Sequence, residues 1–168
     1  MGRKNQFVAL PVSTRAGRFV ARYSVKGLAE LNFPGREALV APKRSEGGRI
    51  PTQVRHWHRA TETALKRILA GREPKKFPPL DLAGTAFQKS VWQAMRKISI
   101  GQTKSYGEIA RAIGRPKAVR AVGGACGANP VPVLVPCHRV LAANGKIGGF
   151  SSGLDWKREL LKNEGIKY

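Results

Sequence analysis

Acidic residues are scarce in this sequence. Only 10 of its 168 residues are Asp or Glu, against 31 Lys and Arg, so the formal net charge is +21. The excess is not confined to a tail, because residues 1–80 contain 17 basic and 5 acidic residues and residues 81–168 contain 14 and 5. A chain that is basic throughout attracts the phosphates of a nucleic acid through counterion release. The charge predicts DNA or RNA as a partner, although a ribosome-associated protein or a basic proteome would carry the same sign.

Cysteine and long apolar runs are also scarce. The two cysteines, Cys126 and Cys137, are too few for a disulfide scaffold and are typical of a reducing compartment. No window approaches the roughly 20 apolar residues that span a bilayer, and the first residues lack an apolar signal segment. We therefore expect an intracellular, cytoplasmic protein without a membrane partner.

The histidines and cysteines do not form a metal-binding pattern. His56, His58 and His138 are the only histidines, and the sequence contains no CxxC or HExxH motif. We expect His56 and His58 to be solvated helix residues and Cys126 to be a small buried apolar side chain. The sequence predicts no bound metal.

The first half of the chain has the pattern of a small sheet with one helix. Residues 7–14, 17–24 and 27–34 are rich in β-branched, aromatic and Leu residues and are separated by turn formers, which predicts two or three strands. Apolar residues at helical spacing predict a helix over residues 53–71. Residues 71–84 hold Gly, three prolines and charged residues, and we interpret them as a linker.

The second half is expected to be mostly helical. Thr85 is a suitable N-cap for a helix that extends to residue 98, and Ser105 for a short helix that Gly114 ends. Pro116 is suited to the first turn of a third helix. Two short helices joined by a tight turn outline a helix-turn-helix, which is common in DNA-binding proteins but is not specific to them.

The third helix has one apolar face and one bare face. Val119, Val122 and Cys126 share the apolar side, while the other side carries Lys117, Arg120, Gly124 and Gly127. A helix that reads base edges in the major groove would offer Asn, Gln or several Arg side chains. Small residues instead suit close approach to a backbone or a narrow groove. Tight helix packing would also explain the glycines, but it would leave Arg120 unexplained, and an arginine there could enter the base stack.

The segment "NPVPVLVPCHRV", residues 129–140, is predicted to be stiff and extended, because each proline fixes its own φ and restricts the residue before it. In an extended segment Cys137 and His138 point to opposite faces. Activation of the thiol would then need a water molecule or a turn just after Pro136. A free thiol is only slightly ionised at neutral pH, so a basic surround and an imidazole would raise its reactivity. At this point a catalytic and a structural role for Cys137 are both open.

The last helix, in "GLDWKRELLKNEGIKY", places a carboxylate on its apolar side. Glu164 stands in the last turn, where a negative charge opposes the helix dipole, so it should have a partner. His138 is the candidate. The alternative is an exposed Glu164 balanced by Lys162 or Lys167.

The motifs "GTAFQ", "SYGEIA", "AVRAVG" and "PCHRV", in this order, resemble the O6-alkylguanine-DNA alkyltransferases, above all the bacterial members and the C-terminal module of the adaptive-response methyltransferase. The likeness runs from Gly84 to Gly165, about half of the chain. It implies an α+β fold, with a small RNase H-like sheet-and-helix domain over residues 1–80. A mostly helical domain over residues 81–168 would carry a winged-helix-like helix-turn-helix and the active-site cysteine.

The resemblance also implies a mechanism. The helix-turn-helix would enter the minor groove of double-stranded DNA through Lys117, Arg120, Ala121 and Gly124, with Arg120 replacing the damaged base in the stack. The alkylated guanine would be flipped into a pocket, because its O6 atom is out of reach in the duplex. Cys137 would take the alkyl group permanently, so each molecule would act once. No cofactor is implied, and the protein is expected to act as a monomer, with cooperativity on DNA and repair of O4-alkylthymine left open.

Further site residues follow from the same resemblance. His138 would deprotonate Cys137 through water while Glu164 holds it, and Asn129 would brace the turn before the active-site segment. Tyr106 would contact guanine N3, Phe150 would stack on the base in place of the usual tyrosine, and the Ser151 amide would donate to O6. The carbonyls of Cys137 and Val140 would accept from the exocyclic amine. Zinc ligands found in the first half of some relatives are absent, because residues 1–80 contain no cysteine, and we expect no attached regulatory domain.

Other classes of protein share some of these features. A non-catalytic damage-recognition module of the same fold usually replaces the cysteine, whereas Cys137 is present. A simple helix-turn-helix regulator would be expected to carry side chains that contact base edges at the positions of Gly124 and Gly127. A thiol protease would leave the charge unexplained. Transfer of an alkyl group to Cys137 is the hypothesis that these residues favour.

Overall fold

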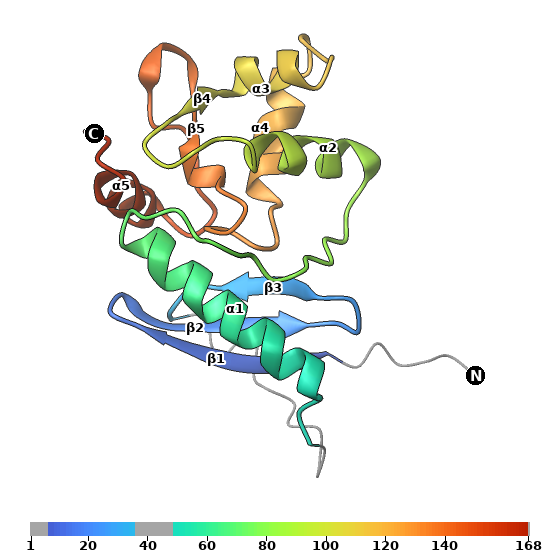
Figure 1. The fold of residues 1–168 in the computed structure, drawn as a ribbon. Coiled ribbons are helices and arrows are strands. Elements are labelled where there is room, and N and C mark those ends of the chain that lie inside the picture. The colour runs from blue at the N-terminus through green and yellow to red at the C-terminus, as the bar shows by residue number, and fades with distance from the viewer. Residues whose placement is uncertain (1–6, 36–48, 168) are drawn as a thin grey trace.

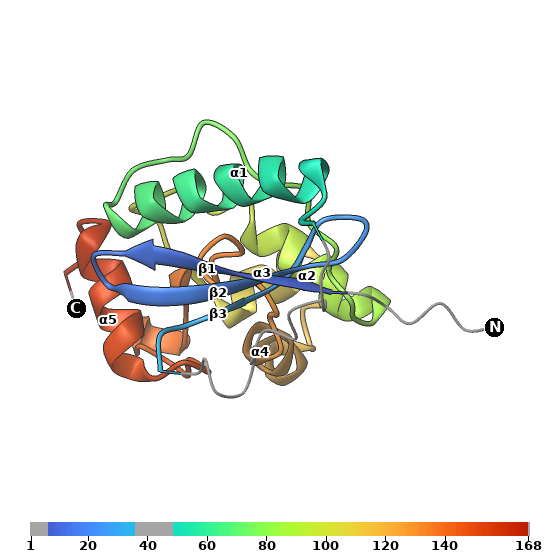
Figure 2. The same cartoon turned by 90° about the horizontal axis from the view of Figure 1, so that it is seen from below.

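The computed structural model describes residues 7–35 and 49–167. The first part is a three-stranded antiparallel sheet, in the order β1-β2-β3, made of β1 (Val8–Thr14), β2 (Gly17–Tyr23) and β3 (Leu28–Asn32). Helix α1 (Thr52–Leu69) lies along one face of this sheet, as Figures 1 and 2 show. The predicted strands and the predicted helix are confirmed, with small shifts at their ends.

The sheet and α1 share an apolar core that also contains a polar contact. Phe19, Ala21 and Tyr23 alternate along β2 and are buried. The Tyr23 hydroxyl donates to Thr61 Oγ1 at 2.9 Å and lies 3.0 Å from His58 Nδ1, so both partners come from α1. The prediction that His58 is a solvated residue is therefore wrong, because its ring packs on the sheet.

The second part is mostly helical, as predicted. It contains four helices, α2 (Ala86–Met95), α3 (Tyr106–Ala112), α4 (Val119–Gly127) and α5 (Leu154–Asn163). The short parallel strands β4 (Lys104–Ser105) and β5 (Val140–Leu141) pair beside α3. The chain therefore has a mixed α/β fold, a small sheet with helices, and the helices α2, α3 and α4 stand together at the end away from the sheet in Figure 1.

Helices α2 and α3 begin at capping boxes, which confirms Thr85 and Ser105 as N-caps. Thr85 Oγ1 accepts from the Gln88 amide at 3.1 Å, and Gln88 Oε1 accepts from the Thr85 amide at 2.9 Å. Ser105 and Glu108 make the same pair of bonds at 3.1 and 2.8 Å. Each box satisfies two amides that lack partners at a helix start.

Helix α4 begins later than predicted. Pro116 lies in the turn before it, where the Ala118 amide donates to the Arg115 carbonyl at 2.9 Å, and the first helical residue is Val119. Val119 is 41% exposed and so does not belong to the buried stripe. The buried residues of α4 are Val122, Ala125 and Cys126, and the Trp92 indole of α2 donates to the Ala125 carbonyl at 2.8 Å. Cys126 is buried, as predicted.

The segment before Cys137 is not the extended rod that its prolines predicted. Val133 has a φ of +75°, and the Val135 amide donates back to the Val131 carbonyl at 2.9 Å, so the chain turns on itself. A single 3₁₀ turn then covers Cys137–Arg139, directly after Pro136. The proline pattern favoured extension residue by residue, but the valines fold inward because Val131, Val133 and Val135 are all fully buried.

The predicted linker is tied to the sheet at its far end. The Leu28 amide donates to the Pro79 carbonyl at 2.8 Å, and the Asp81 amide donates to the Leu28 carbonyl at 2.9 Å. Farther along β3, the Leu31 amide donates to the Pro130 carbonyl at 2.9 Å. The outer edge of β3 is thus paired with the linker and with the segment that leads to Cys137.

Two negative findings concern the described residues. None of the helices over residues 7–35 and 49–167 is long and apolar enough to cross a bilayer. Within the same ranges, no three His, Cys, Asp or Glu side chains are placed so that they could hold a metal ion. Residues 1–6, on which the expected lack of a signal segment partly rests, lie outside the described residues.

Candidate active site and DNA-binding face

Cys137 is a buried thiol held by the backbone before it. It is 5% exposed, and its amide donates to the Val135 carbonyl at 2.8 Å. Asn129 Nδ2 donates both to Cys137 Sγ at 3.2 Å and to the Val135 carbonyl at 2.7 Å. Burial raises the pKa of Cys137 to about 11, although the hydrogen bond from Asn129 opposes this. At neutral pH the resting side chain is the thiol, and a base has to remove its proton before attack.

His138 and Glu164 form the predicted pair. His138 Nε2 lies 2.8 Å from Glu164 Oε1, and neither side chain is exposed. Burial lowers the pKa of His138, so the neutral imidazole is the form at pH 7, and the Glu164 contact fixes its Nε2 as the donor. Its second nitrogen, Nδ1, is buried and has no hydrogen-bond partner among the described residues. The alternative of an exposed Glu164 paired with lysine is wrong.

Arg139 is a further member of this cluster that the sequence did not reveal. Its Nε donates to both Glu164 oxygens, at 3.1 and 2.9 Å, and its Nη2 donates to Oε1 at 2.9 Å. Its Nη1 donates to the Ile98 carbonyl at 2.6 Å. Burial alone would raise the pKa of Glu164, but the hydrogen bonds from His138 and Arg139 hold it below its usual value. Glu164 is therefore an anion between two buried donors.

Lys157 of α5 is a second buried cation near the thiol. Its Nζ donates to the Val140 carbonyl at 2.7 Å and to the Gly149 carbonyl at 3.1 Å. Burial lowers its pKa to about 8, which leaves it mostly charged at neutral pH. The lysine thus joins the chain just after Cys137 to the loop that carries Phe150.

A pocket of about 280 Å³ lies at the thiol. The residues expected around a flipped base are partly assembled here. The walls combine aromatic, small and thiol side chains: Tyr106, Gly123, Cys126, Gly127, Cys137, Gly149, Phe150 and Ser151. Val140 does not line it, because its side chain is fully buried and its carbonyl accepts from Lys157.

Close packing positions both aromatic walls of this pocket. Burial raises the pKa of Tyr106, so its hydroxyl stays protonated and can donate a hydrogen bond. A Cβ at Gly148, which has a φ of +70°, would lie 2.9 Å from the Tyr106 hydroxyl, so only glycine fits there. Phe150 packs edge to face on Phe33, with ring centroids 5.9 Å apart. The first half of the chain therefore supports one wall of the pocket.

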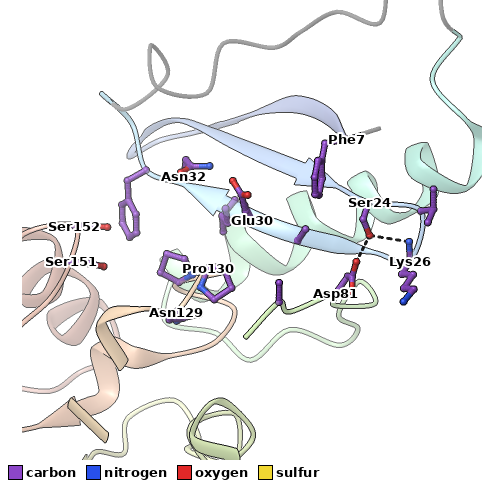
Figure 3. Close-up of a pocket in the computed structure, with 16 residues that line it drawn as sticks. Phe7, Ser24, Lys26, Glu30, Asn32, Asp81, Asn129, Pro130, Ser151 and Ser152 are labelled. Carbon is purple, nitrogen blue, oxygen red and sulfur yellow. Dashed lines mark hydrogen bonds between the residues drawn. The ribbon is translucent and has the colours of Figure 1, made fainter. Parts of the chain in front are cut away.

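A separate hollow of about 530 Å³ lies between the sheet and the second half, and Cys137 does not line it. Figure 3 shows Glu30, Asn32 and Asp81 on its sheet side and Asn129 and Ser151 on the other. Asp81 is held by the Ser24 hydroxyl at 2.5 Å. Asn129 lines this hollow, whereas Cys137 lines the smaller pocket of about 280 Å³.

The residues predicted to contact DNA lie together on the surface of the helix-turn-helix. Lys117, Arg120, Ala121 and Gly124 are all exposed. A Cβ built on Gly123, Gly124 or Gly127 would meet no atom of the described residues within 4 Å. The alternative that these glycines permit tight helix packing is therefore wrong, because no part of the described chain needs the space. The bare face is open to an external partner, and the thiol pocket lies beside it, since Gly123 and Gly127 also line that pocket.

The comparisons with known proteins agree with this arrangement. A family described as "6-O-methylguanine DNA methyltransferase, DNA binding domain" matches residues 86–166. The chain is 61% identical over 142 residues to a methylated-DNA–protein-cysteine methyltransferase from Methanosarcina acetivorans, covering 83% of this chain and 86% of the relative. It is 52% identical over 154 residues to the protein of the same name from Haemophilus influenzae, covering 90% and 83%. The crystal structure of Mycobacterium tuberculosis OGT in complex with DNA has a TM-score of 0.69 and 34% identity, over 94% of this chain and 91% of that one.

The site and these matches define a DNA-binding transferase with a cysteine in its pocket. The chain belongs to the methylated-DNA–protein-cysteine methyltransferase family. Its function is DNA repair by transfer of an alkyl group to a cysteine of the protein itself.

Proposed function

We propose that Cys137 is the acceptor of the alkyl group, that O6-alkylguanine in double-stranded DNA is the substrate, and that each molecule acts once. The observation that carries the proposal is the position of the thiol. It lies in a pocket between Tyr106 and Phe150, next to an exposed helix face whose glycines leave room for an external partner. Cys126 also lines the pocket, but burial raises its pKa to about 12 and its thiol contacts Met95 Sδ at 3.5 Å.

His138 serves as the base in this proposal. With a thiol pKa of about 11, Cys137 needs an acceptor for its proton. The unpaired Nδ1 of His138 is such an acceptor, and a water molecule between Nδ1 and Sγ would carry the proton. Glu164 stabilises the imidazolium that forms, as the carboxylate does in other triads.

The transfer itself is a direct displacement. Sulfur bonds to the alkyl carbon while the bond from that carbon to guanine O6 breaks, and the released guanine takes up the proton that the thiol lost. Asn129 holds Sγ by a hydrogen bond before and during the attack. The thioether cannot be reversed by these groups, which is why each molecule acts once.

Access to O6 requires that the base leave the stack. Arg120 would fill the space that the base leaves, while Lys117, Ala121 and Gly124 would follow the minor groove. Tyr106 would donate to guanine N3, Phe150 would stack on the base, and the Ser151 amide would donate to O6. The carbonyls of Cys137 and Val140 would accept from the exocyclic amine; the Val140 carbonyl already accepts from Lys157, but a carbonyl oxygen has two lone pairs.

The finer description of the molecule is also a proposal. We infer a domain boundary at residues 80 and 81, an RNase H-like first domain and a winged-helix-like second domain. We further propose that the protein acts as a monomer in the cytoplasm, on the DNA that is its substrate. Sedimentation of the free protein and of the DNA complex would test the monomer, and separate expression of residues 81–168 would test the boundary.

Mass spectrometry tests the assignment of the acceptor. The protein is incubated with a duplex that contains O6-methylguanine, and the intact mass and the Cys137 peptide are measured. We expect one methyl group per molecule, on Cys137, with full transfer in Cys126→Ser and none in Cys137→Ser. A methyl group on Cys126, or tight binding of the damaged duplex with unchanged mass, would refute it; the second result would indicate a non-catalytic recognition protein.

A further inference from the structure

The residues that follow α1 touch the backbone that carries Glu164. Gly71 ends the helix in a left-handed conformation, with φ at +67°, its amide bonded to the Ile68 carbonyl at 2.9 Å. A Cβ on Gly71 would overlap the Asn163 carbonyl oxygen and come close to the Cα of Glu164. The end of α1, from the first half of the chain, is therefore packed against the last turn of α5.

Two residues farther along, Glu73 holds a different segment, the turn after α2. Its Oε1 accepts from the Ile100 amide at 2.8 Å. Glu73 is itself fixed by Arg67, whose Nε donates to the Glu73 carbonyl at 2.8 Å. The carboxylate thus reaches from the end of α1 to the turn that follows α2, residues 98–101.

That turn contacts both Arg139 and Glu164, the two charged residues of the cluster with His138. The Ile98 carbonyl accepts from Arg139 Nη1 at 2.6 Å, and the Gly101 amide lies 3.5 Å from Glu164 Oε2. The turn is mostly open to solvent on its other side, since Ser99 and Gly101 are exposed. The turn is therefore anchored at its start by the buried Ile98 and at its exposed end by the hydrogen bond from the Ile100 amide to Glu73.

We propose that the segment Gly71–Glu73 positions the His138–Glu164–Arg139 cluster for proton removal, with Glu73 as the positioning residue. The inference rests on the proposed function, because it assumes that His138 is the base for Cys137. Gly71 sets the place of Glu164 from the α5 side, and Glu73 sets the turn that holds Arg139 and Glu164 from the other. The sheet-and-helix half of the chain thereby contributes to the rate of transfer and not only to stability.

The first test replaces Glu73. Single-turnover rates of methyl transfer at saturating damaged duplex are compared in the wild type, Glu73→Ala, Glu73→Gln and the control Glu62→Ala. The control removes the same charge from α1, where Glu62 is partly exposed and paired with Lys66. Because small misplacements of catalytic groups are costly, we expect a loss of about tenfold in Glu73→Ala. Glu73→Gln keeps an oxygen that accepts from Ile100 and should retain most of the rate. The affinity for the duplex should be the same in all four proteins.

The outcomes separate the two proposals. A wild type that transfers no methyl group refutes the proposed function. A wild type that transfers normally, with Glu73→Ala within twofold of Glu62→Ala, refutes the positioning role alone. A Glu73→Ala protein that loses duplex affinity in proportion to its rate also contradicts it, because the proposal places the effect after binding.

A second variant tests the other contact independently. Gly71→Ala forces the Asn163 carbonyl to move, whereas Gly35 is also left-handed, at φ +83°, and a Cβ there would meet no atom of residues 7–35 and 49–167 within 4 Å. We expect Gly71→Ala to lower the transfer rate at a temperature where it is fully folded, and Gly35→Ala to lower only the unfolding temperature. The two-dimensional NMR signals of the His138 ring nitrogens should shift in Gly71→Ala and not in Gly35→Ala. Equal rates and unshifted signals in both variants would overturn the proposal.

Discussion

The reaction centre, made of Cys137 with His138, Arg139, Lys157 and Glu164, lies beside the exposed face of α4, and the two regions differ in how their polar groups are bonded. Around Cys137 every charged side chain is buried and bonded: Glu164 accepts from His138 and Arg139, and Lys157 is bonded to two carbonyls. On α4, by contrast, Arg120 and the glycines face outward. In the proposed mechanism, the groups that move a proton are fixed before DNA arrives, whereas the binding face is completed by the DNA.

This difference has an energetic reason. Removing a proton from a thiol with a pKa of about 11 requires a base at the right place, and preorganised polar groups cost no rearrangement at the moment of reaction. In the proposed mechanism, contact with a groove requires only charge and close approach, which Lys117 and Gly124 would supply. Changes in the first region should therefore alter chemistry and stability together, and changes in the second should alter DNA binding alone.

The largest effect is expected for Glu164→Gln. The change leaves the buried Arg139 without its anion, and breaking a buried pair in this way costs about 3 to 5 kcal/mol of stability. It also removes the charge that supports His138 as a base, so the transfer rate should fall about a hundredfold. Chemical unfolding and single-turnover kinetics would measure both. Glu159→Gln, on the exposed side of α5, is the control, and equal behaviour of the two variants would contradict the account.

Arg120→Ala should leave stability unchanged and slow repair of a damaged duplex by about tenfold to a hundredfold. Flipping a base costs a few kcal/mol, and the variant loses the side chain proposed to fill the gap. Lys117→Ala is the matched comparison on the same face. It should weaken binding to damaged and undamaged duplex alike and reduce the salt dependence of binding by about one charge. If Lys117→Ala slows repair as much as Arg120→Ala at saturating duplex, Arg120 has no special role.

Acid should destabilise the protein through the reaction centre. The pKa of His138 is lowered on folding, so the unfolded chain takes up its proton first, and stability falls as the pH drops through about 6.5. The pKa of Glu164 is also lowered, so its contribution is lost at still lower pH. Thermal unfolding between pH 8 and pH 4 would show this as a falling midpoint. A Glu164→Gln protein with the same pH dependence as the wild type would contradict it.

The smallest effect is expected for Gly124→Ala, which should raise stability but lower the affinity for DNA. Gly124 lies inside α4, and a Cβ there would meet none of the residues that the structure describes, so Gly124→Ala should stabilise the free protein by about 0.5 to 1 kcal/mol. The same methyl group would stand between the helix and the groove, so affinity for the duplex should fall. Unfolding and DNA binding of one variant test both. Stabilisation with unchanged affinity would show that the bare face is not the binding face.

The sequence predicted the local features of the fold well. Thr85 and Ser105 are caps because their hydroxyls bond to amides three residues away, and that information is local. The predicted start of α4 was wrong because the N-cap residue, Ala118, has no side chain that can cap a helix. The sequence therefore contains no signal that separates the turn at Pro116 from the helix. The turn at Val133 was missed because burial of three valines outweighed the extended preference of the prolines.

The same limit applies to the site. The pairing of Glu164 with His138 could be predicted because a carboxylate at a helix end needed a partner. Arg139 stands in the same "PCHRV" motif, but nothing local shows that it turns toward Glu164 and not toward DNA. Lys157 sits on a helix that is otherwise rich in exposed charges, and only tertiary packing buries it. A basic residue beside a reactive motif in so basic a chain carries little signal of its own.

The most direct test of the contrast compares two substrates in two variants. Free O6-benzylguanine base can reach the pocket without a duplex, whereas O6-methylguanine in DNA also requires binding of the duplex to the exposed face of α4. We expect Glu164→Gln to slow transfer from both substrates by a similar factor, and Arg120→Ala to slow transfer from DNA while the free base reacts at the wild-type rate. Slower reaction of the free base in Arg120→Ala, or a Glu164→Gln protein impaired on only one substrate, would contradict the separation of the reaction centre from the DNA-binding face.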